Sequence, residues 1–164
     1  MYQRLKMNEK IKKHKQTPVY LVEKFFDKEK AIIFKNTFAW MASSFIENYT
    51  GAIWDEVSIC NEQAFYLKIQ AKKNQKFTFT NQAIKLKNLN AIFVSLAITT
   101  CALSAMIEQA HQQEIILSDK EYQNIKHLAY LIINYACDET KHNVAFVDNF
   151  ISFITALSTF KSDS

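Results

Sequence analysis

The sequence predicts an α+β fold. We expect one domain in which about four helices pack against a small antiparallel meander of three strands or slightly more, in the order α-β-β-β-α-α-α. Apolar residues recur every three or four positions before residue 50 and after residue 88, and alternate every second position in between. A chain of 164 residues suits a single core, and its one glycine and one proline leave no flexible linker between domains.

The start of the chain differs from the rest in charge. Six basic residues and one acid give residues 1–15 a charge of +5, whereas the whole chain carries only +4. We therefore expect a flexible basic arm over residues 1–17 and one domain over residues 18–160. No apolar stretch follows the basic residues, as a signal peptide would require. The basic residues of the arm are Arg4, Lys6, Lys10, Lys12, Lys13 and Lys15.

The first elements of the domain follow from the spacing of apolar residues. Between about Glu29 and Tyr49 the spacing is helical, and Gly51 lies where a helix terminator is expected. Alternation with period two follows, and the short polar separators between the runs predict an antiparallel meander. The predicted strands cover residues 53–59, 65–69 and 77–80.

The chain returns to a helical pattern after the strands. Residues 89–110 are apolar nearly all round, which predicts a central helix. Ser118 and Glu121 form a capping box at the start of the next helix, and residues 147–154 indicate a last one. The apolar stretch Ala91–Ile107 is at the short limit for a membrane span, and four hydroxyl residues interrupt it. We therefore expect a buried helix and no membrane partner.

Composition excludes several kinds of site. Glycine-rich phosphate loops need more than one glycine. Three cysteines without a C-x-x-C pair indicate a reducing compartment, and hence a cytoplasmic location. No serine lies in a nucleophile elbow, and the five-residue spacing of Cys137 and His142 points them to different faces of a helix. We expect no catalytic residues, no enzyme activity and no cofactor.

Two Glu-x-x-His pairs leave a metalloprotein open as an alternative. At a spacing of three on a helix both side chains can reach one metal ion, and di-iron carboxylate proteins use two such pairs with further glutamates. Both pairs, however, lie near predicted helix ends, where solvated charged residues are common. We therefore assign no metal ligands. The pairs are Glu108 with His111 and Glu139 with His142, and Glu47 is the main candidate for a further ligand.

Lysine clusters leave a second alternative, a nucleic-acid-binding accessory protein. Residues 66–87 carry six lysines and no acid, and together with the basic arm they suit contact with phosphates. Nineteen of the twenty basic residues are lysine, which attracts phosphate as a point charge but lacks the planar fork that reads guanine. The composition therefore favours weak nonspecific contact over sequence-specific binding.

The segment 38–66 places uncommon residues at a defined spacing. Phe-Ala-Trp-Met at 38–41 is followed by Tyr-Thr-Gly-Ala-Ile-Trp at 49–54, then by Asn61 and Phe65-Tyr66. This pattern resembles the signature of the ArdB/KlcA antirestriction family, and the similarity extends over about residues 25–150. Ala52 replaces one glycine of that signature, and other turn glycines of the family are absent. We expect asparagines to form those turns, because asparagine tolerates left-handed backbone best after glycine. They are Asn61, Asn74, Asn81 and Asn88.

The resemblance implies a small non-enzymatic bacterial protein that relieves restriction by type I restriction–modification enzymes. We predict that it inhibits the host restriction–modification enzyme, or another host defence protein, through an aromatic contact surface. DNA mimicry needs a strongly acidic surface, which this chain lacks. We expect at least one of Trp54 and Phe65 to belong to the core instead. The predicted surface comprises Trp40, Tyr49, Gly51, Trp54, Asn61, Phe65 and Tyr66.

Overall fold

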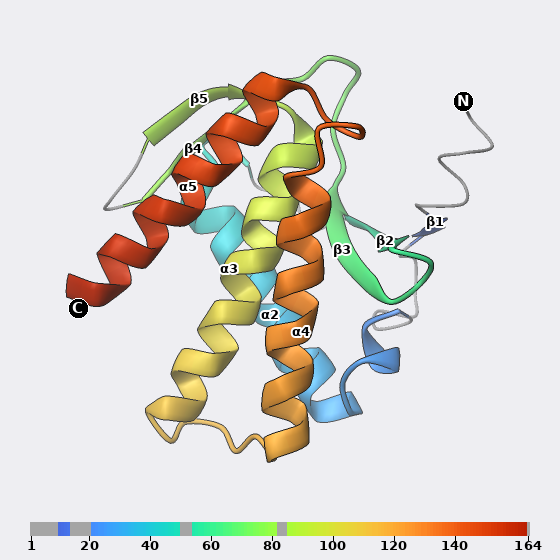
Figure 1. Cartoon of the computed structure of the whole chain (residues 1–164), viewed down its shortest axis with the longest axis vertical. Helices are drawn as coiled ribbons and strands as arrows, with labels where there is room; N and C mark the ends of the chain where they lie inside the picture. Colours follow the sequence, from blue (N-terminus) through green and yellow to red (C-terminus); the bar gives the residue numbers. More distant parts are fainter. Residues whose placement is uncertain (1–9, 14–20, 50–53, 82–84, 164) are drawn as a thin grey trace.

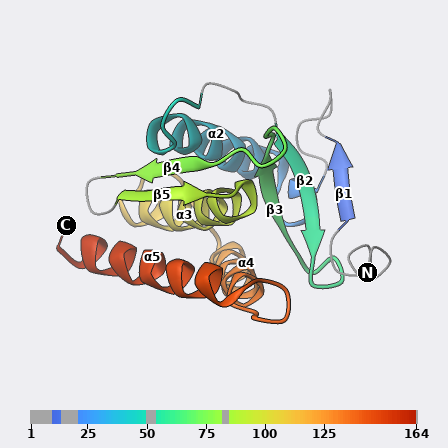
Figure 2. The same ribbon diagram turned by 90° about the horizontal axis from the view of Figure 1, so that it is seen from above.

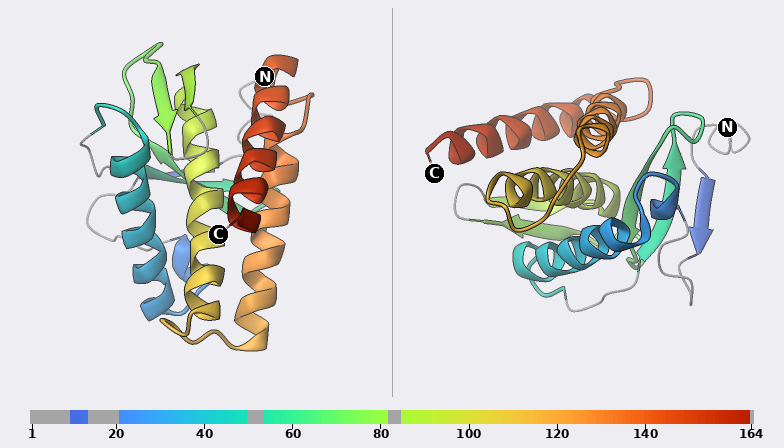
Figure 3. Two further views of the ribbon diagram at one scale, coloured as in Figure 1. Left: turned by 90° about the vertical axis from the view of Figure 1, so that its left-hand side faces the viewer. Right: turned by 90° about the horizontal axis from the view of Figure 1, so that it is seen from below.

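The computed structural model describes residues 10–13, 21–49, 54–81 and 85–163. Within these ranges four α-helices pack against two small antiparallel sheets, which confirms the α+β class predicted from the sequence. Helices α2 (Lys28–Phe45), α3 (Ala91–His111) and α4 (Asp119–Ala136) stand side by side with α3 in the middle (Figures 1 and 3). Helix α5 (Val144–Asp163) packs along α3.

The strands form two sheets and not the single meander that the sequence predicts (Figure 2). Strands β2 (Trp54–Ile59) and β3 (Ala64–Ile69) form the expected hairpin. The next strand, β4 (Phe77–Thr80), does not continue that sheet but pairs with β5 (Lys85–Leu89), a strand that the sequence pattern does not indicate. The third strand therefore has the predicted residues, but its predicted pairing with the second strand is wrong.

The outer edge of β3 explains this difference. The Leu67 N–H donates to Thr99 Oγ1 at 3.2 Å, and the Ile69 N–H donates to Ser95 Oγ at 2.9 Å. Both hydroxyls belong to α3, so this helix occupies the edge where β4 would have to pair. Buried backbone N–H groups need a partner, and side-chain hydroxyls of a packed helix meet that need as well as a strand does.

The other edge of the sheet corrects the prediction of a flexible arm. Residues Lys10–Lys13 form strand β1, which pairs antiparallel with β2 in the register Lys13 to Asp55 and Lys10 to Ser58. Pairing with β1 satisfies backbone groups of β2 that would otherwise lie at an open edge. The rest of the predicted arm, including Arg4, Lys6 and Lys15, lies outside the described residues.

Helix α2 ends earlier than its apolar spacing predicts. Asp27 caps its start by accepting from the Lys30 N–H at 2.8 Å. The helix stops at Phe45 because Ile46 leaves it in extended conformation and forms a β-bridge with Phe79, while the Glu47 N–H donates to the Thr78 carbonyl at 3.0 Å. Attachment to β4 therefore ends the helix, and the expected terminator Gly51 lies outside the described residues.

Helix α3 is the central helix that the sequence predicts. Twelve of its 21 residues are buried, and Asn90 caps it by accepting from the Phe93 N–H at 2.7 Å. By length and composition α3 could cross a membrane, and 67% of its most apolar window is buried inside the protein. The hydroxyl residues that interrupt the apolar stretch include Ser95 and Thr99, which fasten this helix to β3.

The last two helices start at side-chain caps and close the core. Ser118 and Glu121 form the predicted capping box of α4, and Asn143 accepts from the Phe146 N–H at 2.8 Å at the start of α5. Phe93 of α3 meets three phenylalanines of α5 at ring distances of 5.2, 5.6 and 6.2 Å. These rings are Phe146, Phe150 and Phe153. Contacts between these phenylalanine rings thus join α5 to the core.

Asparagines form two of the four turns expected to lack glycine, and a third, Asn88, is left-handed inside strand β5, where its register with β4 shifts. Asn61, Asn74 and Asn88 have φ of 54°, 61° and 60°, whereas Asn81 is not among the residues with positive φ. In the turn between β2 and β3, Cys60 and Glu62 are also left-handed, with φ of 56° and 67°. The hairpin therefore turns through three consecutive left-handed residues, which are unfavourable for side chains with a Cβ.

A buried carboxylate holds the segment before α2 against the sheet. Glu56 of β2 is only 1% exposed, and its Oε1 accepts from the backbone N–H groups of Leu21 at 2.7 Å and Val22 at 3.3 Å. These residues open the 3₁₀ turn η1 (Val22–Lys24). Burial lowers the pKa of Lys35 to about 8, and the charge of Glu56 opposes this shift. The charges of Glu56 and Glu23 therefore partly offset the cost of burying the Lys35 ammonium.

Candidate functional site

The structure removes three residues from the predicted contact surface. Trp54, Phe65 and Tyr66 are all buried, because both faces of β2 and β3 are covered by helices. On one face Phe65 packs against Phe34 of α2 at a ring distance of 5.5 Å. On the other face Tyr66 meets Tyr135 of α4 at 6.3 Å. The expectation that at least one of Trp54 and Phe65 belongs to the core is confirmed for both.

Trp54 connects α2 with the start of β2. Its ring lies edge-on to Phe38 at 5.4 Å, and Lys35 Nζ lies 5.3 Å from its centroid. Phe38 and Trp54 are two of the residues that carry the family resemblance. Their spacing therefore serves the packing of helix against sheet.

Trp40 lies on the opposite side of α2 and is 62% exposed. Its ring meets Phe45 at 5.9 Å, and Phe45 packs in turn on Phe79 of β4 at 5.7 Å. The C-terminal end of α2 is also tied to β4 through the bridge between Ile46 and Phe79. Trp40 is therefore an exposed aromatic side chain on a firmly held helix.

The remaining predicted surface residues do not gather around Trp40. Asn61 is exposed at the turn between β2 and β3, on the side of the molecule opposite the C-terminal end of α2 (Figures 1 and 2). Tyr49 is half-buried, and burial raises its pKa. Gly51 lies outside the described residues. The seven predicted residues thus do not form one surface, and Trp40 is the large aromatic side chain among them that the structure leaves exposed.

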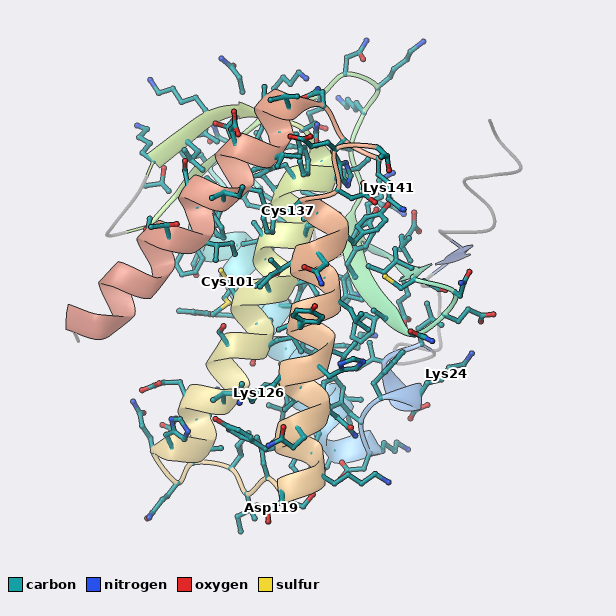
Figure 4. All side chains as sticks on the ribbon, in the orientation of Figure 1. Lys24, Cys101, Asp119, Lys126, Cys137 and Lys141 are labelled. Atoms are coloured by element: carbon teal, nitrogen blue, oxygen red, sulfur yellow. The ribbon has the colours of Figure 1, made fainter. Side chains whose placement is uncertain are left out.

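The two Glu-x-x-His pairs lie at opposite ends of α4. His111 ends α3 and precedes α4, whereas Glu139 and His142 lie in the link between α4 and α5. The 18 residues of α4 span about 27 Å, and Figure 4 places Asp119 and Lys141 at its two ends. The pairs therefore cannot hold one metal ion. Among the described residues no group of three or more His, Cys, Asp or Glu side chains could do so.

His142 is enclosed by aromatic rings and does not form a dyad with an activated thiol. Its ring stacks on Phe146 at 4.3 Å and lies edge-on to Tyr135 at 5.2 Å. Its Nε2 is buried and has no hydrogen-bond partner in the described part of the chain. Burial raises the pKa of Cys137, which is the opposite of what a nucleophilic thiolate needs. The pair therefore lacks the activated thiol of a nucleophilic dyad.

The enclosure of His142 predicts a loss of stability in mild acid. Burial lowers the pKa of His142 below 6.5, and Lys141 also lowers it while Asp138 acts against both. Below pH 6.5 the unfolded chain therefore binds a proton that the folded chain resists, so the free energy of unfolding falls as pH falls. One proton limits the slope to about 1.4 kcal/mol per pH unit. Urea unfolding at pH 7.5 and 5.5 should show this loss.

Two variants decide whether His142 causes that loss. His142→Phe should flatten the pH dependence, and His127→Gln, at an exposed histidine of α4, should leave it as in the unaltered protein. An equal pH dependence in all three proteins would assign the effect to other groups.

A basic cavity of about 630 Å³ lies where the loop between β3 and β4 meets the start of α3. The lysine-rich stretch is visible in the sequence but the cavity is not, because only the fold brings residues 68–76 beside Asn90 and Ala91. Four lysines line it: Lys68, Lys72, Lys73 and Lys76.

Comparison with known proteins adds no assignment. No protein-family model, no curated protein and no solved structure matches this chain. The residues and their arrangement are therefore the basis for the proposed function.

Proposed function

We propose that this protein is an antirestriction protein that binds a host type I restriction–modification enzyme, or another host defence protein, and inhibits it without catalysing a reaction. The pattern of residues 38–66, which resembles the ArdB/KlcA signature, supports this function. The observation that carries it is the exposure of Trp40. Phe38 and Trp54 of the same pattern are buried in the core, whereas Trp40 is 62% exposed. Packing of the core therefore does not account for a tryptophan at this position of the pattern.

The outer face of α2 has the properties of a protein-binding surface. Ile32 and Trp40, two turns apart on the helix, are both large exposed apolar residues. The inner face of α2 is fixed by buried Phe34 and Phe38, so the outer side chains are presented on a rigid element. Exposed tryptophans on rigid elements are frequent anchors of protein interfaces, and truncating one commonly costs 2 kcal/mol or more of binding free energy.

The distribution of charge argues against DNA mimicry. A mimic must present an acidic surface to the groove that binds DNA. The loop between β3 and β4 instead presents Lys72, Lys73 and Lys76 as exposed side chains. We place the activity in the cytoplasm, the compartment of restriction enzymes and the one that the cysteine content indicates.

Plating of unmodified phage on a restricting host tests this function. Expression of the protein should raise the plating efficiency toward that on a non-restricting host. Trp40→Ala should reduce this relief at least tenfold, because a loss of about 2 kcal/mol corresponds to a roughly 30-fold weaker complex. The matched control is Tyr130→Ala, which removes an aromatic ring of 61% exposure from α4. This control should change the relief by less than twofold.

Folding of both variants is checked by circular dichroism and by their urea unfolding curves. Absence of any relief by the unaltered protein contradicts the antirestriction function. Equal relief by folded Trp40→Ala and Tyr130→Ala contradicts the assignment of the contact surface.

A further inference from the structure

The basic cavity is lined by residues that do not include Trp40. Its walls are the loop of residues 70–76, the adjoining ends of β2 and β3, and the first turn of α3 (Figure 1). Its volume of about 630 Å³ is within the usual range of small-molecule sites. The lining includes four lysines and one acid, Asp55.

The lysines of the cavity are available to bind an anion. Among the described residues none of the four forms an ion pair. The loop that carries three of them is ordered, because the Lys72 N–H donates to Gln75 Oε1 at 2.8 Å and the Gln75 N–H donates to the Lys72 carbonyl at 3.0 Å. Asn74 completes the turn with φ of 61°. Backbone hydrogen bonds thus hold the lysines around the cavity.

The remaining lining favours a phosphate over a base or an apolar ligand. Ala91 and Ile92 belong to the first turn of α3, which contains no acidic residue, and the positive end of a 21-residue helix attracts anions. The described residues that line the cavity include amide side chains, and none of them has an aromatic ring that could stack on a base. The amide side chains are Gln70, Asn74, Gln75 and Asn90. We propose that this cavity is a binding site for phosphate groups.

The position of β1 favours the phosphates of a nucleic-acid backbone over a free polyphosphate. Asp55 lines the cavity and is paired in register with Lys13 of β1. From that position β1 leads away along the sheet edge through Lys12 to Lys10, a distance of about 10 Å. Two basic segments that are distant in sequence thus have neighbouring backbones in the fold, an arrangement that suits a polymer with repeated phosphates better than a single small anion.

Two triple variants of equal charge test the site. The cavity variant replaces Lys72, Lys73 and Lys76 by Gln, and the control variant replaces the exposed Lys28, Lys120 and Lys126 by Gln. Removing three lysines takes the formal charge from +4 to +1 in both. Fluorescence anisotropy with a labelled 20-base-pair duplex measures backbone binding at several salt concentrations. Calorimetry with tripolyphosphate measures binding of free phosphate.

The cavity variant should bind the duplex at least tenfold more weakly at 50 mM salt, and the slope of log affinity against log salt should fall by about 2 to 3, as expected for losing three phosphate contacts. The control variant should lose less than threefold. Cavity-dependent binding of tripolyphosphate without binding of DNA supports the site and identifies a free polyphosphate as its ligand. Equal losses in both variants, or no binding of either probe below 1 mM, overturn the proposal. These binding experiments test the cavity alone, and the plating experiment tests restriction relief through Trp40 separately.

Discussion

Glu56→Ala is expected to lower the free energy of unfolding by about 3 to 5 kcal/mol, which is a large part of the stability of a domain of this size. Glu56 is 1% exposed and accepts from the backbone N–H groups of Leu21 and Val22. Alanine leaves both donors without this acceptor in the interior. It also removes the negative charge that partly offsets the burial of Lys35.

Urea unfolding followed by tryptophan fluorescence measures this effect, and two further variants bracket it. Glu56→Gln keeps the shape and one acceptor oxygen while removing the charge, so it should cost about 1 to 3 kcal/mol. Glu62→Ala removes an acid of the adjacent turn whose ion pair with Lys24, at 3.7 Å, is about half exposed on both sides. That change should cost less than about 1 kcal/mol. A Glu56→Ala variant as stable as Glu62→Ala would show that Glu56 does not hold η1 against the sheet.

The second large effect is expected where α3 replaces a strand at the edge of β3. Thr99→Val and Ser95→Ala each remove the acceptor of one buried backbone N–H, of Leu67 and Ile69 respectively. Each variant should lose about 1 to 3 kcal/mol of unfolding free energy, because a buried donor without a partner keeps its full desolvation penalty. Amide hydrogen exchange should accelerate at Leu67 in the first variant and at Ile69 in the second.

Thr100→Val is the matched control for the edge of β3. Thr100 is a buried neighbour on the same helix, and its hydroxyl donates to the Leu96 carbonyl at 2.9 Å, within the helix itself. Since no strand amide among the described residues donates to Thr100, this variant should cost less than about 1 kcal/mol and leave exchange in β3 unchanged. If Thr99→Val behaves like Thr100→Val, the hydroxyl of Thr99 is not what completes the edge.

The helical half of the fold could be predicted from the sequence because its signals are local. Apolar spacing and the box of Ser118 with Glu121 depend on residues at most a few positions apart. The left-handed backbone at Asn61, Asn74 and Asn88 could be predicted for the same reason, because asparagine tolerates this conformation, although Asn88 lies in β5 and not in a turn. The hairpin of β2 and β3 follows from alternation and a short polar turn.

The sheet order could not be predicted, because it depends on partners far along the chain. The hydroxyls of Ser95 and Thr99 appear in the sequence as interruptions of an apolar helix. Their role at the edge of β3 is visible only once α3 lies beside that strand. Ser95 is 26 residues from Ile69, and Thr99 is 32 residues from Leu67. Strand β1 could not be predicted for the same reason, because these four residues of a basic segment form a strand only by pairing with the edge of β2.

The features of the candidate site also differ in whether the sequence alone predicts them. The pattern of residues 38–66 and the lysine-rich stretch are properties of the sequence by itself, as are the fold class and the central helix. Only the tertiary structure decided that Trp54, Phe65 and Tyr66 are core while Trp40 is exposed, and that four lysines surround a cavity at the start of α3. The physical reason is that local spacing determines which side of an element a residue occupies. Whether that side is covered depends on which other elements pack there.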